Sequence, residues 1–288
     1  MARKVGSRRV AGGSSAAFSP VWVVVSYFLI CGGLLAAASG YAAVGARDPG
    51  AGYAAFFVGA ALGGFLAGRA SPHKSYAEPA LAAALVVVSV LLFVRSTPMG
   101  KMAMAFVGTE VNRHAMIAGG LGFAGGFFGA VLGEATQPRD PALLPLRWLV
   151  LGVIISLGAL FAGGTAAAIV LLNDAAKAAL DQMWATGAVD GSRPLVTEDR
   201  VIVAAAAAAA SASLLGGFVT QLGAPRRMLL PSALGVAVAM CGTLLAIAGA
   251  AHRTKEMVGP ALAFGAAAGA AAFLAALAAY LVFTRRRA

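Results

Sequence analysis

The sequence predicts an all-α integral membrane protein with about eight transmembrane helices, in which a helical hairpin is repeated three times. Three observations predict this fold class. The chain has 288 residues, of which 60% are hydrophobic and only 11% charged, whereas soluble domains hold about 25% charged residues. Its apolar residues form long continuous runs, as a bilayer core of roughly 30 Å requires of each helix. Three runs carry the same motif, Gly-Gly-Phe, at 63–65, 125–127 and 216–218.

The apolar runs predict helices rather than strands. They are continuous and rich in Ala and Leu, without the alternation of a membrane barrel. In lipid every backbone amide needs a partner within its own segment, and a helix supplies one. The predicted spans are 21–44, 52–67, 80–94, 115–133, 148–172, 201–222, 229–250 and 258–283.

The first span follows a basic N-terminal tail, residues 1–20. The basic start, the apolar run 21–35 and the small residues Ala36 to Ala38 also fit a signal peptide. The apolar stretch continues to Val44, which is long enough to span a membrane and favours a retained first helix. Cleavage would leave seven helices. We treat 21–284 as one helical bundle that ends in a basic C-terminal segment, 285–288.

The repeated hairpins are expected at about 51–95, 115–172 and 201–250. Each has a first helix with the motif near one end, a polar turn with proline, and a return helix. The last span holds Ala271-Ala272-Phe273-Leu274 at the motif position, so it fits a decayed fourth copy. A repeat of this kind indicates duplication.

The motif helices are dense in small residues four positions apart. Lipid is as apolar as leucine, so membrane helices associate by close packing, which small residues permit. The glycines therefore predict a packing surface, and the alternative is that they line a pathway. The predicted packing positions are Gly59, Gly63, Gly64, Gly125, Gly126, Gly129, Gly133, Gly216, Gly217, Gly265 and Gly269.

Two segments between the spans have features of their own. The segment 96–114 is rich in methionine and predicts a short amphipathic element in the headgroup region. After the fifth span, an apolar stripe through Leu180 and Trp184 predicts that the helix extends beyond the membrane before a break at 191–194. Thr197 then predicts a cap for the sixth helix, with an acidic first turn.

The basic charge is unevenly distributed. With the N-terminus in the cytoplasm, the cytoplasmic segments hold 13 of the 22 Lys and Arg residues but only 3 of the 11 acidic ones. The positive-inside rule then predicts that both termini are cytoplasmic. Topology and anionic lipid headgroups account for the excess of positive charge, so a nucleic-acid partner is not expected.

No constellation of catalytic residues stands out. His73, His114 and His252 lie at span ends or in loops and lack metal-ligand spacing. Cys31 and Cys241 lie within apolar runs and predict packing residues. We therefore expect no enzyme activity, no metal and no cofactor. Polar residues near the cytoplasmic ends of the motif helices form either a polar ring or snorkelling interface residues, and these are Arg69, Glu134 and Gln221.

The string 63–69, Gly-Gly-Phe-Leu-Ala-Gly-Arg, resembles a motif of uncharacterised bacterial multi-pass membrane proteins. In those proteins a Gly-Gly-aromatic-x-Ala-Gly-Arg run closes one helix before a polar turn. The resemblance covers the first hairpin and fades in the others, where Val131 and Leu222 stand in place of Arg69. It implies a helical hairpin and brings no activity with it.

These observations favour a non-catalytic polytopic protein of a bacterial inner membrane. We expect a structural, assembly or accessory subunit whose partners are the lipid bilayer and either other membrane subunits or a second copy of itself. The alternative is a channel or transporter for a small or apolar solute. Inverted repeats are frequent in transporters, whereas the copies predicted here are parallel.

Overall fold

The computed structural model describes residues 18–43, 48–71, 76–98, 100–101, 111–137, 145–187, 197–224, 228–250 and 254–284. This part of the chain holds eight helices, each long and apolar enough to cross a membrane. The predicted all-α class and helix number are confirmed. The helices are α1 (Pro20–Ala43), α2 (Pro49–Ala70), α3 (Ala77–Ser96), α5 (Val111–Ala135), α6 (Pro145–Thr186), α7 (Glu198–Gly223), α8 (Leu229–Ala250) and α9 (Thr254–Thr284).

The second and third helices are longer than their apolar runs. The helix α2 spans 22 residues and α3 spans 20. The carboxylate of Asp48 accepts a hydrogen bond from the amide of Ala51 at 2.8 Å and caps α2, with Pro49 in the first turn. The charged side chains of Arg69 and Arg95 belong to the last turns. Apolar composition misses such ends because polar residues in the headgroup region are still helical.

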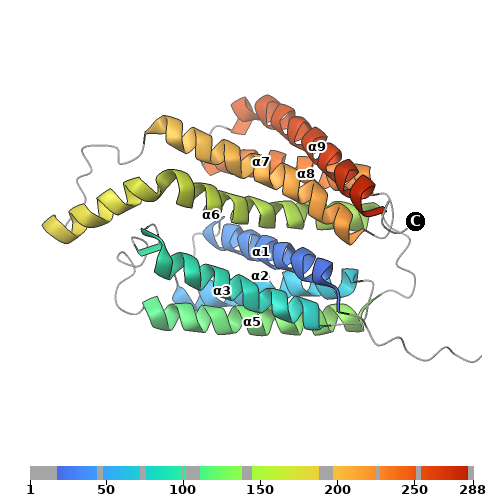
Figure 1. The fold of residues 1–288 in the computed structure, drawn as a ribbon, viewed down its shortest axis with the longest axis horizontal. Coiled ribbons are helices and arrows are strands. Elements are labelled where there is room, and N and C mark those ends of the chain that lie inside the picture. The colour runs from blue at the N-terminus through green and yellow to red at the C-terminus, as the bar shows by residue number, and fades with distance from the viewer. Residues whose placement is uncertain are drawn as a thin grey trace, which may run out of the picture.

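The fifth helix along the chain, α6, confirms the predicted extension. It has 42 residues without interruption, a length of about 63 Å at 1.5 Å per residue. Its C-terminal part projects beyond the rest of the bundle (Figure 1), and the side chain of Trp184 is 79% exposed. The next helix, α7, begins at Glu198 with Thr197 at the capping position, as predicted, although the Thr197 side chain makes no capping hydrogen bond.

The eight helices form two groups of four, and both groups pack in the same way (Figure 1). In the N-terminal unit, which we define as α1, α2, α3 and α5, the first and fourth helices each pack against the second and third. The C-terminal unit, α6 to α9, repeats this pattern with α6 and α9 against α7 and α8. In both units the second and third helices also touch each other, and the first and fourth are not a packed pair among the described residues.

The three-fold repeat of a hairpin is not confirmed. The predicted second hairpin joins α5 and α6, but these helices belong to different units and, in the described residues, do not form a packed pair. The first and third hairpins pair α2 with α3 and α7 with α8, which pack less extensively than α2 with α5 or α6 with α7. The hairpins predicted from the motif are thus not the main packed pairs of the structure.

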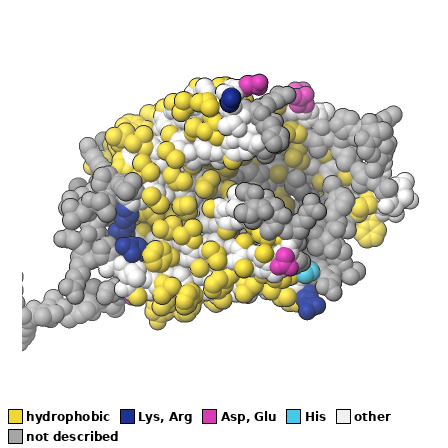
Figure 2. Space-filling model, turned by 180° about the vertical axis from the view of Figure 1, so that it is seen from behind, with side chains coloured by type: hydrophobic (Ala, Val, Ile, Leu, Met, Phe, Trp, Pro, Cys, Tyr) yellow, Lys and Arg dark blue, Asp and Glu magenta, His cyan; other side chains and the backbone are white. Residues whose placement is uncertain are grey.

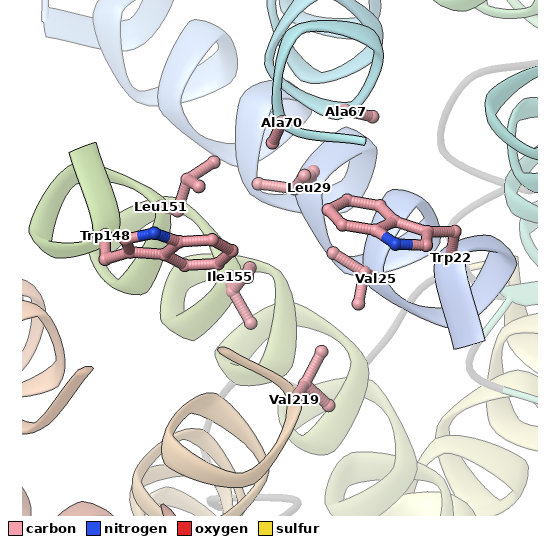
Figure 3. Close-up of a cluster of buried hydrophobic side chains, with 9 residues drawn as sticks. All are labelled: Trp22, Val25, Leu29, Ala67, Ala70, Trp148, Leu151, Ile155 and Val219. Carbon is pink, nitrogen blue, oxygen red and sulfur yellow. The ribbon is translucent and has the colours of Figure 1, made fainter. Parts of the chain in front are cut away.

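The two units meet through α1, which packs against α6 and α7. A cluster of buried side chains lies at this junction (Figure 3): Trp22, Val25, Leu29, Ala67, Ala70, Trp148, Leu151, Ile155 and Val219. By contrast, large apolar side chains such as Phe128 and Leu274 are more than half exposed. In Figure 2 hydrophobic side chains cover most of the described surface on this face, with the charged ones at its edges. This distribution suits a protein surrounded by lipid.

Several predicted features lie outside the described residues. They are the basic tail up to residue 17, the basic end 285–288, the polar turns around 72–75, 138–141 and 225–227, the break at 191–194, and most of the methionine-rich segment, with His73 and His252.

Candidate functional site

The glycines of α2 and α5 bring the two helix backbones into direct contact. A Cβ atom added to Gly125 would lie 2.5 Å from the carbonyl oxygen of Phe57. The same contact recurs one turn later between Gly129 and the Ala61 oxygen, at 2.0 Å. Gly133 repeats it at 2.2 Å against the oxygen of Phe65. Both helices advance four residues in the same direction at each step, so α2 and α5 are parallel.

Glycines of α2 face two different neighbours. A Cβ atom on Gly64 would lie 2.1 Å from the oxygen of Gly126 in α5. One on Gly59 or Gly63 would instead meet α1, at 2.7 Å from the Gly33 oxygen and 2.4 Å from the Ile30 Cα. The helix α2 is therefore packed so closely against α5 and α1 that these glycine positions have no room for a side chain.

The C-terminal unit has the corresponding contacts. A Cβ atom on Gly217 of α7 would lie 2.3 Å from the Ala272 oxygen of α9, and one on Gly216 would lie 2.5 Å from Ser156 Oγ of α6. In α9, Gly265 and Gly269 face α8 near Ala237. All eleven glycines named from the sequence are buried.

Sequence spacing missed other glycines in similar contacts. Gly32 of α1 and Gly158 of α6 each face a backbone carbonyl of the other helix, within about 2 Å of an added Cβ atom. Gly68 and Gly235 also lie against carbonyl oxygens of neighbouring helices. Except for Gly68, they stand apart from the repeated motif, so the motif gave no signal for them.

The three residues of the expected polar ring belong to both units: Arg69 ends α2 and Glu134 ends α5, whereas Gln221 lies near the end of α7. Arg69 and Glu134 lie at the adjacent ends of α2 and α5, since a Cβ atom on Gly133 would lie 2.7 Å from the Arg69 amide nitrogen. The Arg69 guanidinium lies 5.7 Å from the ring centre of Phe65. Gln221 belongs to the other unit and accepts a hydrogen bond from the amide of Met228 at 3.1 Å.

The polar groups at this end instead cap the C-terminus of α2. The side-chain amide of Gln137 donates hydrogen bonds to the carbonyls of Gly68 at 2.6 Å and Ser71 at 3.1 Å. The guanidinium of Arg147, at the start of α6, donates to the carbonyl of Arg69. The last carbonyls of a helix lack partners within the helix, and a cation there also opposes the helix dipole favourably. These contacts fix α2 to the neighbouring helices α5 and α6.

Glu78 is an unexpected buried carboxylate. It is only 1% exposed, in the first turn of α3. Its Oε1 accepts a hydrogen bond at 3.1 Å from the amide of Ser19, directly before α1, while Oε2 is buried with no hydrogen-bond partner among the described residues. A carboxylate at the N-termini of two helices is favoured by both helix dipoles. The sequence had placed Glu78 only as a charge on the cytoplasmic side.

Other candidate groups are held by ordinary contacts. The hydroxyl of Tyr53 and Nδ1 of His114 are hydrogen-bonded, with the rings stacked at 5.8 Å. Cys31 and Cys241 are free thiols. Within the described part of the chain, no group of three or more His, Cys, Asp or Glu residues could hold a metal ion.

Comparisons of the chain with protein-family models, with curated proteins and with solved structures gave no match. The resemblance of 63–69 to bacterial membrane hairpins remains a prediction. The site is therefore interpreted from its geometry alone, as a set of close backbone contacts and helix caps.

Proposed function

We propose that this protein is a non-catalytic multi-pass membrane protein that serves as a structural, assembly or accessory subunit in a bacterial inner membrane. The observation that supports the proposal is the row of backbone contacts between α2 and α5. Gly125, Gly129 and Gly133 each lie where one added carbon atom would meet a carbonyl of α2. A face occupied by the neighbouring backbone has no room for a solute, which favours packing over a pathway.

The remaining parts of the proposal follow from sequence chemistry. The positive-inside rule places both termini in the cytoplasm, and the lipid bilayer is the immediate partner of the apolar exterior. An accessory role adds a second protein, either another membrane subunit or a second copy of the chain. Enzyme activity, cofactors and nucleic acid have no part in the proposal.

A channel or transporter for a small or apolar solute is the second candidate, and one observation favours it. The chain has two four-helix units with the same packing pattern. Parallel repeats of this kind occur in transporters, where the axis between them runs along the membrane normal. In this case a solute would pass between the units and not along the motif glycines.

A matched pair of variants tests the packing role of the glycines. Gly129→Ala places a Cβ atom 2.0 Å from the Ala61 oxygen, so the two helices must separate. Gly120→Ala, on the same helix, meets nothing within 4 Å and gains about 1 kcal/mol of helix propensity. We expect Gly129→Ala to lower the yield and the melting temperature in detergent, and Gly120→Ala to lower neither.

Solute flux into liposomes separates the two candidates. If the glycines serve only in packing, Gly129→Ala lowers the stability of the protein and does not otherwise change solute flux. A stable Gly129→Ala protein with altered flux would contradict the packing role and support a pathway along α5.

A further inference from the structure

The Gly-Gly-Phe motif occupies equivalent places in the two units. It lies in the second helix of each, α2 and α7, and its second glycine packs against the fourth helix. A Cβ atom on Gly64 would lie 2.1 Å from the oxygen of Gly126, and one on Gly217 would lie 2.3 Å from that of Ala272. Gly126 and Ala272 are themselves the second residues of Gly125-Gly126-Phe127 and Ala271-Ala272-Phe273. The motif of α5 and the decayed copy of α9 are thus counterparts.

The first helices of the units, α1 and α6, match at a constant spacing of 126 residues. Trp22 corresponds to Trp148, and Gly32 to Gly158. The same spacing relates the buried side chains at the junction: Val25 to Leu151 and Leu29 to Ile155. All six side chains of these helices in the cluster therefore form three corresponding pairs.

The contacts between α1 and α6 are reciprocal. A Cβ atom on Gly32 would lie 1.9 Å from the oxygen of Ile154, and one on Gly158 would lie 2.0 Å from that of Phe28. Ile154 and Phe28 are again 126 residues apart. Each glycine therefore contacts the residue four positions before its counterpart. An interface in which residue i meets j while j meets i is the hallmark of a two-fold axis.

The cluster itself has the arrangement that such an axis requires. In Figure 3 Trp22 and Trp148 lie on opposite sides of the cluster. The pairs Val25 with Leu151 and Leu29 with Ile155 lie opposite each other across the same centre (Figure 3). Val25 is seen beside Ile155, and Leu29 beside Leu151, which is the reciprocal pattern of the glycines.

We infer that the chain is an internal duplication of a four-helix unit, and that its two copies dock like the subunits of a symmetric dimer. The docking surface is the face of the first helix that carries Trp22, Val25 and Leu29, or Trp148, Leu151 and Ile155. Its partner is the same surface of the other unit. The pseudo-two-fold axis runs between α1 and α6 along the helices, so the copies are parallel.

An exchange of residues between counterpart positions tests this inference in the full-length chain. The exchange variant combines Val25→Leu and Leu29→Ile in α1 with Leu151→Val and Ile155→Leu in α6. Each position receives the residue of its counterpart. If a two-fold axis relates the faces, the exchange regenerates the original set of neighbours, rotated by half a turn, and the melting temperature in detergent stays that of the unchanged protein.

The control places the same four residues at the same four positions without this symmetry. It makes only half of the exchange, Leu29→Ile with Ile155→Leu, so that Val25 lies beside a leucine and Leu151 beside an isoleucine. The residue content of the cluster is unchanged, but the pairings are new, and tightly packed cores resist such changes in shape. We expect the control to melt measurably lower than the exchange variant.

Every other pattern overturns the inference. If the exchange variant fails to fold or melts as low as the control, the two faces are not equivalent. If both variants melt like the unchanged protein, the melting temperature depends only on the total volume of the cluster and not on a symmetric arrangement of its side chains.

Discussion

A glycine in this bundle matters because it has no side chain, which lets the backbone of a neighbouring helix lie directly against it. The eleven predicted positions could be named because four-residue spacing places small residues on one face of a helix. The same logic could not find Gly32 or Gly158, whose partners lie on a helix more than a hundred residues away. The pairing of helices decides which helix faces a glycine, and a local sequence pattern does not predict that pairing.

Glu78 shows that the local sequence also fails to predict the burial of a polar residue. The sequence counted it only among the three acidic residues of the cytoplasmic side, whereas the packing of α3 against α1 buries it. The burial is tolerated because the carboxylate accepts a hydrogen bond from the amide of Ser19, and buried polar groups are costly without such partners.

Replacement of Glu78 should therefore reduce stability. Glu78→Ala leaves the Ser19 amide without its acceptor, and we expect a loss of about 1–3 kcal/mol. Glu78→Gln keeps an acceptor oxygen and should lose less. Unfolding of both variants in detergent, followed by tryptophan fluorescence, measures the difference. An unchanged unfolding curve for Glu78→Ala would show that the bond contributes nothing.

Among the helices, the apolar runs predicted the number and order of the spans, and missed their ends. The ends are set by caps that involve residues far apart in sequence. The C-terminus of α2 is held by Gln137 and Arg147, and neither has a local signature. The extension of α6 could be predicted because its apolar stripe continues past the membrane-length run.

Loss of the Arg147 cap should loosen the end of α2. Arg147→Met keeps the apolar stem and removes the donor to the Arg69 carbonyl, with an expected cost of about 1–2 kcal/mol. Amide hydrogen exchange in the last turn of α2 should rise with it. Lys177→Met, an exposed change on the same helix, is the control and should stay within about 0.5 kcal/mol. Equal effects from both variants would rule out a specific cap.

For the molecule as a whole, the sequence predicted the class and not the arrangement. Three occurrences of Gly-Gly-Phe indicated three hairpins, because neighbours in sequence were taken as neighbours in space. In the structure α2 packs most extensively against α5, and α7 packs against both α6 and α9, so the motifs fall into two units of four helices. The decayed fourth copy at Ala271 and Ala272 could be recognised in the sequence, but the number of motifs does not say which helices pack together.

The arrangement has a consequence for topology. The N-terminal end of α1 and the C-terminal end of α9 lie at the same end of the bundle (Figure 1), and the basic residues favour the cytoplasmic side for it. Reporter enzymes that are active on only one side of the membrane, fused to either terminus, should both report the cytoplasm. Opposite signals from the two termini would contradict an even number of spans.

The proposed role as an accessory subunit is tested most directly by the native mass of the protein, purified in mild detergent from its own host. We expect a complex in which the chain is present with a second component in fixed proportion, either another membrane protein or a further copy of itself. Replacement of Gly129 by alanine should weaken that complex only to the extent that it destabilises the chain. A protein that runs as a lone monomer of 28.6 kDa under the same conditions would contradict the subunit role and leave solute transport as the better explanation.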